Sequence, residues 1–229
     1  MKKVSILAVC ISALTLFSCD GQKGKSSVVL HNTADSVAYG IGISIGSNMQ
    51  KDGLDSLDLD ILKKAIAAVF KKDSLMMNTQ QAQTVIQSYL GEKQRQKGEA
   101  NLAAGKKYLD ENKKKPGVIV LPDGLQYSVV KQGTGPNATM ADTVVIHYHG
   151  TLIDGTIFDS SVDKGEPAEA PVSIFVKGFA EALQLMNVGS KFHVVIPAEL
   201  AYGERGSGPR VPPNSTLIFE LEMLNIKGK

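Results

Sequence analysis

The stretch of sequence that decides the fold is TVVIHYHGTLIDGTIFDSS, residues 143–161. Its first ten residues are rich in β-branched and aromatic side chains, which favour a strand. Asp154-Gly155 is a typical hairpin turn, and Thr156-Ile157-Phe158 begins a second run of strand formers. The stretch therefore predicts two consecutive antiparallel strands.

Similar short β-rich runs surround this hairpin, and turn residues such as Pro122-Asp123-Gly124 separate them. Further strands are expected at residues 118–121, 125–131, 191–196 and 216–226. A single short helix is expected at residues 179–186. Together these elements predict an α+β domain of residues 116–229, in which an antiparallel sheet wraps on one short helix.

Residues 36–49 have an ambiguous period. Apolar side chains recur every four positions, as on a helix, at Val37, Ile41 and Ile45, yet apolar residues also alternate there as on a strand. Periodicity alone does not decide, and helix is the interpretation that we favour. On a helix, a groove where another backbone can approach closely would be formed by Ala38, Gly42 and Gly46.

The next segment predicts a short helix that is capped by Asp58 or Ser56 and ends near Lys71-Lys72. Its apolar stripe consists of Leu59, Leu62, Ile66 and Val69. With the helices on either side, it forms a segment of residues 33 to about 90 that has too little interior to hide its apolar side chains. We therefore expect this segment to form a homodimer.

A run that begins at Asn78 or Thr79 meets no proline before Pro116, which predicts one long helix. Its second half is rich in lysine and has little to bury, so it is expected to be a solvated stalk. Three glycines spaced by seven mark either a packing face or points of flexibility: Gly91, Gly98 and Gly105. Residues 33–115 are thus expected to be a helical dimerisation domain with a long stalk helix.

The N-terminus has the pattern of an export signal. Lys2 and Lys3 precede an apolar stretch, residues 4–17, that is too short to span a bilayer permanently. Leu16-Phe17-Ser18-Cys19 resembles a bacterial lipobox, which implies a lipoprotein signal peptide at residues 1–18 and a lipid on Cys19. Residues 19–32 would be a flexible tether to the membrane. The alternative is an ordinary cleaved signal with a leftover cysteine.

Composition excludes several other classes of function. Without the first 18 residues, whose only charged side chains are Lys2 and Lys3, the 23 remaining basic residues match the 23 acidic ones. Such a balance argues against a nucleic-acid partner, which would need a basic excess. Because Cys10 and Cys19 are the only cysteines, cysteine chemistry is excluded from the folded body.

Several motifs in order along residues 116–229 resemble the signature of FKBP-type peptidyl-prolyl cis-trans isomerases. They are His147-Tyr148-His149-Gly150, Asp154-Gly155, Phe158-Asp159-Ser160-Ser161, GFAEALQLM at 178–186, Gly189-Ser190-Lys191, Ile196-Pro197, Leu200-Ala201-Tyr202-Gly203, Val211-Pro212-Pro213-Asn214 and Leu217-Ile218-Phe219. The helical N-terminal part, the stalk and the lipobox resemble the macrophage-infectivity-potentiator-like (Mip-like) branch of that family. Its members are dimeric isomerases and chaperones of the cell envelope.

The resemblance implies an apolar aromatic bowl that receives a proline ring and works without a cofactor. Catalytic positions would be Tyr148, Phe158, Asp159, Tyr202 and Phe219, and substrate-binding positions would be Phe175, Val176, Phe179 and Val211. The family usually has tryptophan where this chain has Phe179, and a small aliphatic residue where it has Phe175. The bowl should therefore stay aromatic but change its shape.

Two other kinds of site fit the sequence less well. His147 and His149 share a face of one strand and His193 lies on another, but no carboxylate or cysteine has metal-ligand spacing, so no metal is expected. Ser160 and Ser161 have no partnered base nearby in sequence, which disfavours a hydrolase.

The predicted function is acceleration of the folding of exported proteins at their prolines. The protein would be lipid-anchored in the cell envelope, at the outer membrane facing the periplasm, and its partners would be unfolded or exported proline-containing chains. The alternative is a non-catalytic envelope chaperone or binding module on the same fold.

Overall fold

The computed structural model describes residues 28–54 and 56–228. Residues 1–57 and residues 58–229 form two units, which are treated separately. The predicted signal peptide, the lipidation of Cys19 and residues 19–27 of the predicted tether lie outside the described residues. None of the helices within the described ranges is both long enough and apolar enough to cross a membrane.

Helix α1 (Thr33–Lys51) is the main element of the first unit. Its N-cap is Asn32, whose side chain accepts a hydrogen bond from the backbone N–H of Asp35. The ambiguous period of residues 36–49 is therefore resolved as a helix, as we favoured. No residue of α1 is buried, and the side chain of Val37 is 56% exposed.

Helices α2 (Leu59–Lys71) and α3 (Thr79–Asn112) begin the second unit, and both begin at caps that the sequence offered. Asp58 accepts hydrogen bonds from two backbone N–H groups at the start of α2. Asn78 forms a capping box with Gln81, which fixes the start of α3. The prediction of one long helix before Pro116 is confirmed.

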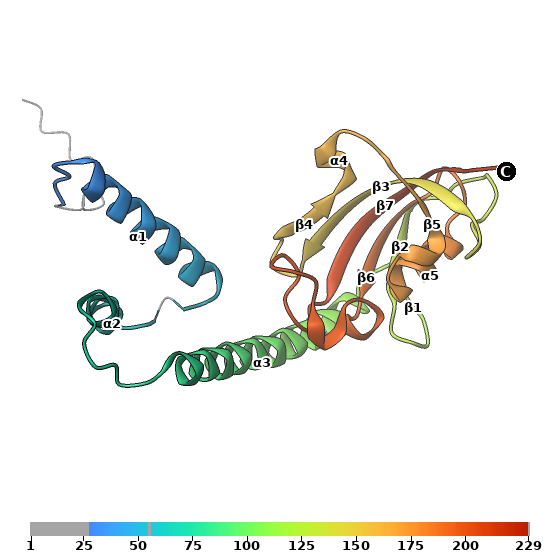
Figure 1. Ribbon diagram of the computed structural model, residues 1–229. Helices are drawn as coiled ribbons and strands as arrows, with labels where there is room; N and C mark the ends of the chain where they lie inside the picture. The colour runs from blue at the N-terminus through green and yellow to red at the C-terminus, as the bar shows by residue number, and fades with distance from the viewer. Residues whose placement is uncertain (1–27, 55, 229) are drawn as a thin grey trace, which may run out of the picture. The chain divides into compact units, whose positions relative to one another are not determined.

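The remainder of the second unit is a seven-stranded antiparallel sheet (Figure 1). Its strands are β1 (Ile119–Val120), β2 (Gln126–Lys131), β3 (Thr143–Leu152), β4 (Ile157–Ser160), β5 (Ala168–Pro171), β6 (Lys191–Ile196) and β7 (Leu217–Ile226). The order is β1-β2-β6-β7-β3-β4, and β5 pairs with β3. The predicted hairpin is β3–β4, whose turn contains Gly155 at a φ of +85°.

Helix α5 (Lys177–Leu185) packs against the sheet through one buried face. Its buried residues, Phe179 and Leu183 among them, join one apolar core with residues of β3, β6 and β7. The short helices are α4 (Ser161–Lys164), η1 (Val172–Ile174), η2 (Ala198–Leu200) and η3 (Gly203–Arg205). The predicted fold class, an antiparallel sheet on one short helix after an all-α region, is thus confirmed, whereas β5 and α4 were not predicted.

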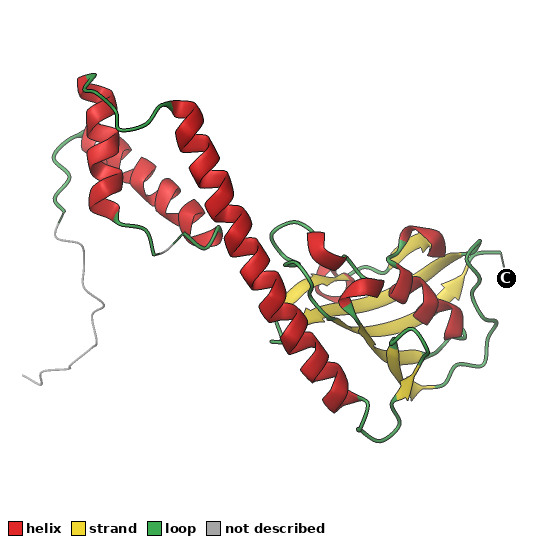
Figure 2. Ribbon diagram, turned by 90° about the horizontal axis from the view of Figure 1, so that it is seen from below, coloured by secondary structure: helices red, strands yellow, loops and turns green. Residues whose placement is uncertain are grey.

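The second half of α3 packs against the sheet domain (Figure 2). A Cβ atom on Gly105 would lie 2.3 Å from Oγ1 of Thr216. The helix can therefore approach the sheet domain this closely only because residue 105 is a glycine. Further along α3, Asn112 is buried and its side-chain nitrogen donates to Oε1 of Gln126 at 3.0 Å. The expectation of a solvated stalk is wrong for this face of the helix, and Gly105 marks a packing face.

Candidate functional site

Five aromatic rings meet where α5 crosses the sheet. Tyr148 is on β3, Phe158 on β4, Phe179 on α5 and Phe219 on β7, and Phe175 directly follows η1. Phe179 is central: its ring centre lies 4.6 Å from that of Phe175 in a stacked arrangement and 4.8 Å from that of Phe219, edge to face. This cluster is the aromatic bowl of the following description.

Gly150 in β3 makes room for two of these rings. In the sheet it pairs with Asp159 of β4 on one side and with Phe219 of β7 on the other. A Cβ atom on Gly150 would lie 2.7 Å from the ring of Phe219 and 2.8 Å from that of Phe158. Glycine at this position is therefore required by the packing of the bowl.

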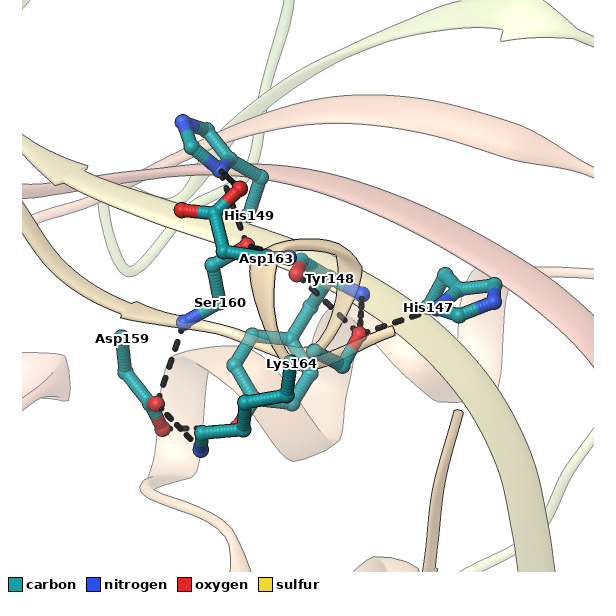
Figure 3. A network of polar contacts seen from close by, with 8 residues as sticks. His147, Tyr148, His149, Asp159, Ser160, Asp163 and Lys164 are labelled. Carbon is teal, nitrogen blue, oxygen red and sulfur yellow. Dashed lines mark hydrogen bonds and ion pairs between the residues drawn. The ribbon is translucent and has the colours of Figure 1, made fainter. Parts of the chain in front are cut away.

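A polar network centred on Asp159 adjoins the bowl (Figure 3). The hydroxyl of Tyr148 donates to Oδ2 of Asp159 at 2.6 Å, and Nζ of Lys164 donates to Oδ1 at 2.7 Å. The backbone N–H of Ser160 donates to the same Oδ1 at 3.0 Å. Asp159 thus accepts three hydrogen bonds, two of them from side chains on neighbouring elements.

These contacts decide the charge of Asp159. Partial burial alone would raise the pKa of its carboxyl, but the hydrogen bonds from Lys164 and Tyr148 and the charge of Lys164 outweigh burial and lower it. Burial, and then the hydrogen bond to Asp159, raise the pKa of Tyr148. At neutral pH the site therefore holds a carboxylate, a neutral phenol and an ammonium group.

Lys164 was not found from the sequence. It lies on α4, which begins where Oγ of Ser160 accepts a hydrogen bond from the backbone N–H of Asp163. This single turn directs Lys164 back to Asp159. A serine cap directly after the aspartate was the available signal.

The remaining predicted positions differ in their surroundings. Val211 is buried in the core cluster and Val176 packs against it, half-buried, just before α5. Tyr202 lies between η2 and η3 and is 40% exposed. Among the described residues its ring contacts none of the five aromatics of the bowl, and its hydroxyl has no hydrogen-bond partner. Ring contacts and the hydrogen bond to Asp159 therefore bring together six of the nine predicted site residues. Val176 and Val211 lie in the same apolar core, and Tyr202 is at the surface.

A hollow of about 210 Å³ opens beside Asp159. Its lining is Ile157, Phe158, Asp159, Ser160, Asp163, Lys164 and Arg210. One edge of the bowl and the ion pair therefore face the same space, in which a ligand could contact both.

The three histidines near the sheet have separate partners. Nδ1 of His147 lies 3.1 Å from Oγ of Ser161, Nδ1 of His149 lies 3.0 Å from Oγ of Ser160, and Nδ1 of His193 lies 2.6 Å from Oε1 of Glu220. Over residues 28–54 and 56–228, no three histidine, cysteine or acidic side chains are grouped as a metal ion would require.

Comparisons with known proteins agree with this architecture. The family model described as FKBP-type peptidyl-prolyl cis-trans isomerase matches residues 135–224, and the model of the domain amino terminal to such isomerases matches residues 34–129. The chain is 46% identical over 192 residues to the FKBP-type 22 kDa peptidyl-prolyl cis-trans isomerase of Escherichia coli, covering 82% of this chain and 93% of that relative.

Similarity extends over the helical region as well. The chain is 36% identical to the outer membrane protein MIP of Legionella longbeachae, with 98% of each chain covered. The crystal structure of FkpA from Escherichia coli superposes with a TM-score of 0.68 at 35% identity, over 87% of this chain and 99% of that one.

An antiparallel sheet over one short helix, with an aromatic bowl at their junction, defines a protein of the FKBP class. Relatives that match both the helical region and this domain identify the branch. The chain belongs to the FKBP-type peptidyl-prolyl cis-trans isomerases of the Mip-like branch, and it catalyses rotation about X-Pro peptide bonds.

Proposed function

We propose that the aromatic bowl is the place where this isomerase binds the proline ring of its substrate. Rotation about an X-Pro bond has a barrier of about 18 to 20 kcal/mol because twisting removes amide resonance, and no covalent intermediate is needed to lower it. A dry aromatic surface binds the twisted amide better than the planar one when it excludes the water that favours resonance. The observation that carries the assignment is the ring cluster around Phe179.

The polar groups have complementary roles in this proposal. Asp159, held ionised by Lys164, faces the carbonyl carbon of the twisted bond and fixes the hydroxyl of Tyr148. The free hydroxyl of Tyr202 donates to the carbonyl oxygen once a substrate is bound. Neither group transfers a proton. Lys164 is a positioning residue, because it acts through Asp159.

The test is isomerisation of a proline tetrapeptide by wild type, Tyr202→Phe and Asp159→Ala. Each variant should lower kcat/KM by about five-fold or more, since removal of one well-placed polar group costs on the order of 1 to 3 kcal/mol of transition-state stabilisation. Tyr127→Phe is the matched control, because its ring stacks on Phe192 outside the bowl. Wild-type activity in both site variants would show that the assignment is wrong.

We further propose that residues 33 to about 90 pair with a second copy of the chain. Large apolar side chains on α1, α2 and the start of α3 support this, because they face solvent in the single chain. The exposed ones include Val37, Ile41, Ile45, Ile66, Val69, Phe70, Val85 and Ile86. Pairing would bury them and would give each assembly two isomerase domains.

The proposed location is the cell envelope, with a lipid on Cys19 that anchors the protein to the outer membrane on its periplasmic side. The lipobox supports the anchor, and the Legionella relative is named as an outer membrane protein. Clients would then be exported chains that contain proline. Metabolic labelling with palmitate should mark the wild type and not Cys19→Ala, and an unlabelled wild type would contradict the anchor.

A further inference from the structure

A groove of about 270 Å³ lies between α3 and the sheet domain. Helix α3 contributes Lys97 and Asn101 to its lining, the β3–β4 hairpin contributes residues between 152 and 156, and the loop before β7 contributes residues between 209 and 216. The lining mixes apolar and charged groups, as expected of a surface that binds polypeptide.

Contacts across the groove hold its walls in place. The side-chain nitrogen of Asn101 donates to the backbone oxygen of Pro213 at 2.8 Å. One turn earlier on α3, a Cβ atom on Gly98 would lie only 3.2 Å from the side chains of Asn214 and Pro213. Because these contacts already fix both walls, a ligand would lose little free energy in ordering them.

The groove adjoins the hollow beside Asp159, because the two share a lining residue. Arg210 lines both the groove and the hollow beside Asp159. Its neighbour Val211 belongs to the core cluster that includes the bowl. On the hairpin, Thr156 lines the groove and Asp159 follows three residues later, so the two lie within about 10 Å of each other.

The charges of the groove favour an acidic ligand. Lys97 and Arg210 form no ion pair among the described residues, and Asp154 is the only acidic side chain of the lining. Hydrogen bonds from Thr156, and less strongly the charge of Lys97, lower the pKa of Asp154. Within the groove, two cations therefore face one carboxylate, which leaves an excess of positive charge there. Arg210 also lines the hollow that contains Asp159, Asp163 and Lys164, and no ion pair joins it to either carboxylate among the described residues.

We propose that this groove binds the part of the client chain that flanks the proline in the bowl, with a preference for an acidic side chain beside Lys97 and Arg210. The proposal rests on the bowl being the isomerase site. An extended chain spans about 10 Å with three residues, so the acidic residue should lie about three or four positions from the proline. Helix α3 is then a direct substrate contact as well as a connection between domains.

The experiment uses the full chain and peptides that contain a single proline and have an acetylated N-terminus and an amidated C-terminus. Glutamate is placed at each of four positions on either side of the proline, and each peptide has a matched glutamine version. For each pair, kcat/KM is measured by NMR exchange at low and at high salt. At three or four residues on one side of the proline, the Glu/Gln ratio should be about two to five, falling at high salt.

Three variants locate the preference. Lys97→Gln and Arg210→Gln should each bring the Glu/Gln ratio close to one. Lys107→Gln should keep the wild-type ratio, because Lys107 is an exposed lysine of α3 that is outside the groove. In the NMR spectrum of wild type, the side-chain amide of Asn101 should shift on addition of the preferred glutamate peptide and less with its glutamine version.

The outcomes separate the groove from the bowl. Wild type with no activity on the glutamine peptides would overturn the assignment of the bowl. Normal activity on those peptides with a Glu/Gln ratio of one at every position would overturn the groove alone. If the glutamate preference is lost in Arg210→Gln but kept in Lys97→Gln, α3 is not part of the binding surface. If Lys107→Gln loses the preference equally, the preference arises from the overall charge of the protein and the groove is not its source.

Discussion

The two halves of α3 reverse the usual relation between residue type and burial. In the first half, Val85 and Ile86 are 58% and 53% exposed in the single chain. In the second half, the buried residues are Gly98, Gly105 and Asn112. Apolar side chains of the first half are thus exposed among the described residues, whereas glycine and asparagine are buried where the second half packs closely on the sheet domain.

The difference shows that two kinds of surface can share one helix. The second half packs on its own chain through close backbone approach and side-chain amides, as at Asn101 and Asn112. The first half carries large apolar side chains that are exposed in the described part of the chain, as on a surface that binds another molecule. We interpret the second half of α3 as a fixed joint to the sheet domain and the first half as part of the proposed dimer interface.

The largest expected effect is on association, in Ile86→Asp. A carboxylate buried in a paired apolar face costs on the order of 2 kcal/mol or more, so the dissociation constant of the dimer should rise about thirty-fold or more. Sedimentation analysis over a range of concentrations measures this. The control is Lys107→Asp, which places the same side chain on the second half of α3, outside the proposed interface. If both variants associate like wild type, the first half of α3 is not the interface.

A smaller effect is expected on stability when alanine replaces glycine in each half. At Gly105 the new Cβ atom would collide with Thr216, which is buried, so the free energy of unfolding should fall by about 1 kcal/mol or more. At Gly91 a Cβ atom would have nothing within 4 Å among the described residues apart from the neighbouring backbone of its own helix. Alanine there should raise the free energy of unfolding by up to about 1 kcal/mol through helix propensity. Denaturant unfolding compares the two. Effects of the same sign and size would contradict the close packing of the second half.

The smallest effect concerns the ion pair in the sheet domain. Lys164→Gln should raise the pKa of Asp159 toward its ordinary value, which carboxyl NMR titration measures. Because the pKa of Asp159 is lowered by folding, its contribution to stability is present above the unfolded value near 4 and is lost as pH falls through the folded value. Lys177→Gln is the control, since Lys177 pairs with Asp123. If Asp159 titrates in Lys164→Gln as it does in wild type, Lys164 does not lower the pKa of Asp159 and is not a positioning residue.

Much of the fold could be predicted from local sequence. Strands β3 and β6 have the predicted bounds, and Asp58 and Asn78 cap α2 and α3 as two of the offered residues. Strand β5, by contrast, reads AEAP and has neither strand formers nor alternation. It exists because β3 offers it a free edge, which only the assembled sheet reveals.

The candidate site, like the fold, was predicted from the sequence only in part. The resemblance to the FKBP family pointed to the bowl residues, because Phe158 and Phe219 belong to the motifs that carry it. Lys164 was not found, because its contact with Asp159 depends on the turn of α4 between them. The spacing of the glycines left a packing face and points of flexibility both open, and the contact of Gly105 with Thr216, far along the chain, decides for packing at that position. A lysine-rich helix half with few apolar residues looks solvated unless its partner surface is known.

The central claim is that the two apolar surfaces have different occupants: proline in the bowl and a second chain on the helices. The most direct measurement compares wild type, Ile86→Asp and Asp159→Ala in two assays, tetrapeptide isomerisation and the refolding of a protein whose slow step is prolyl isomerisation. Ile86→Asp should keep tetrapeptide activity and lose several-fold in refolding, because one client can no longer contact two bowls at once. Asp159→Ala should lose both activities. Equal loss of tetrapeptide activity in the two variants, or wild-type refolding by Ile86→Asp, would contradict the claim.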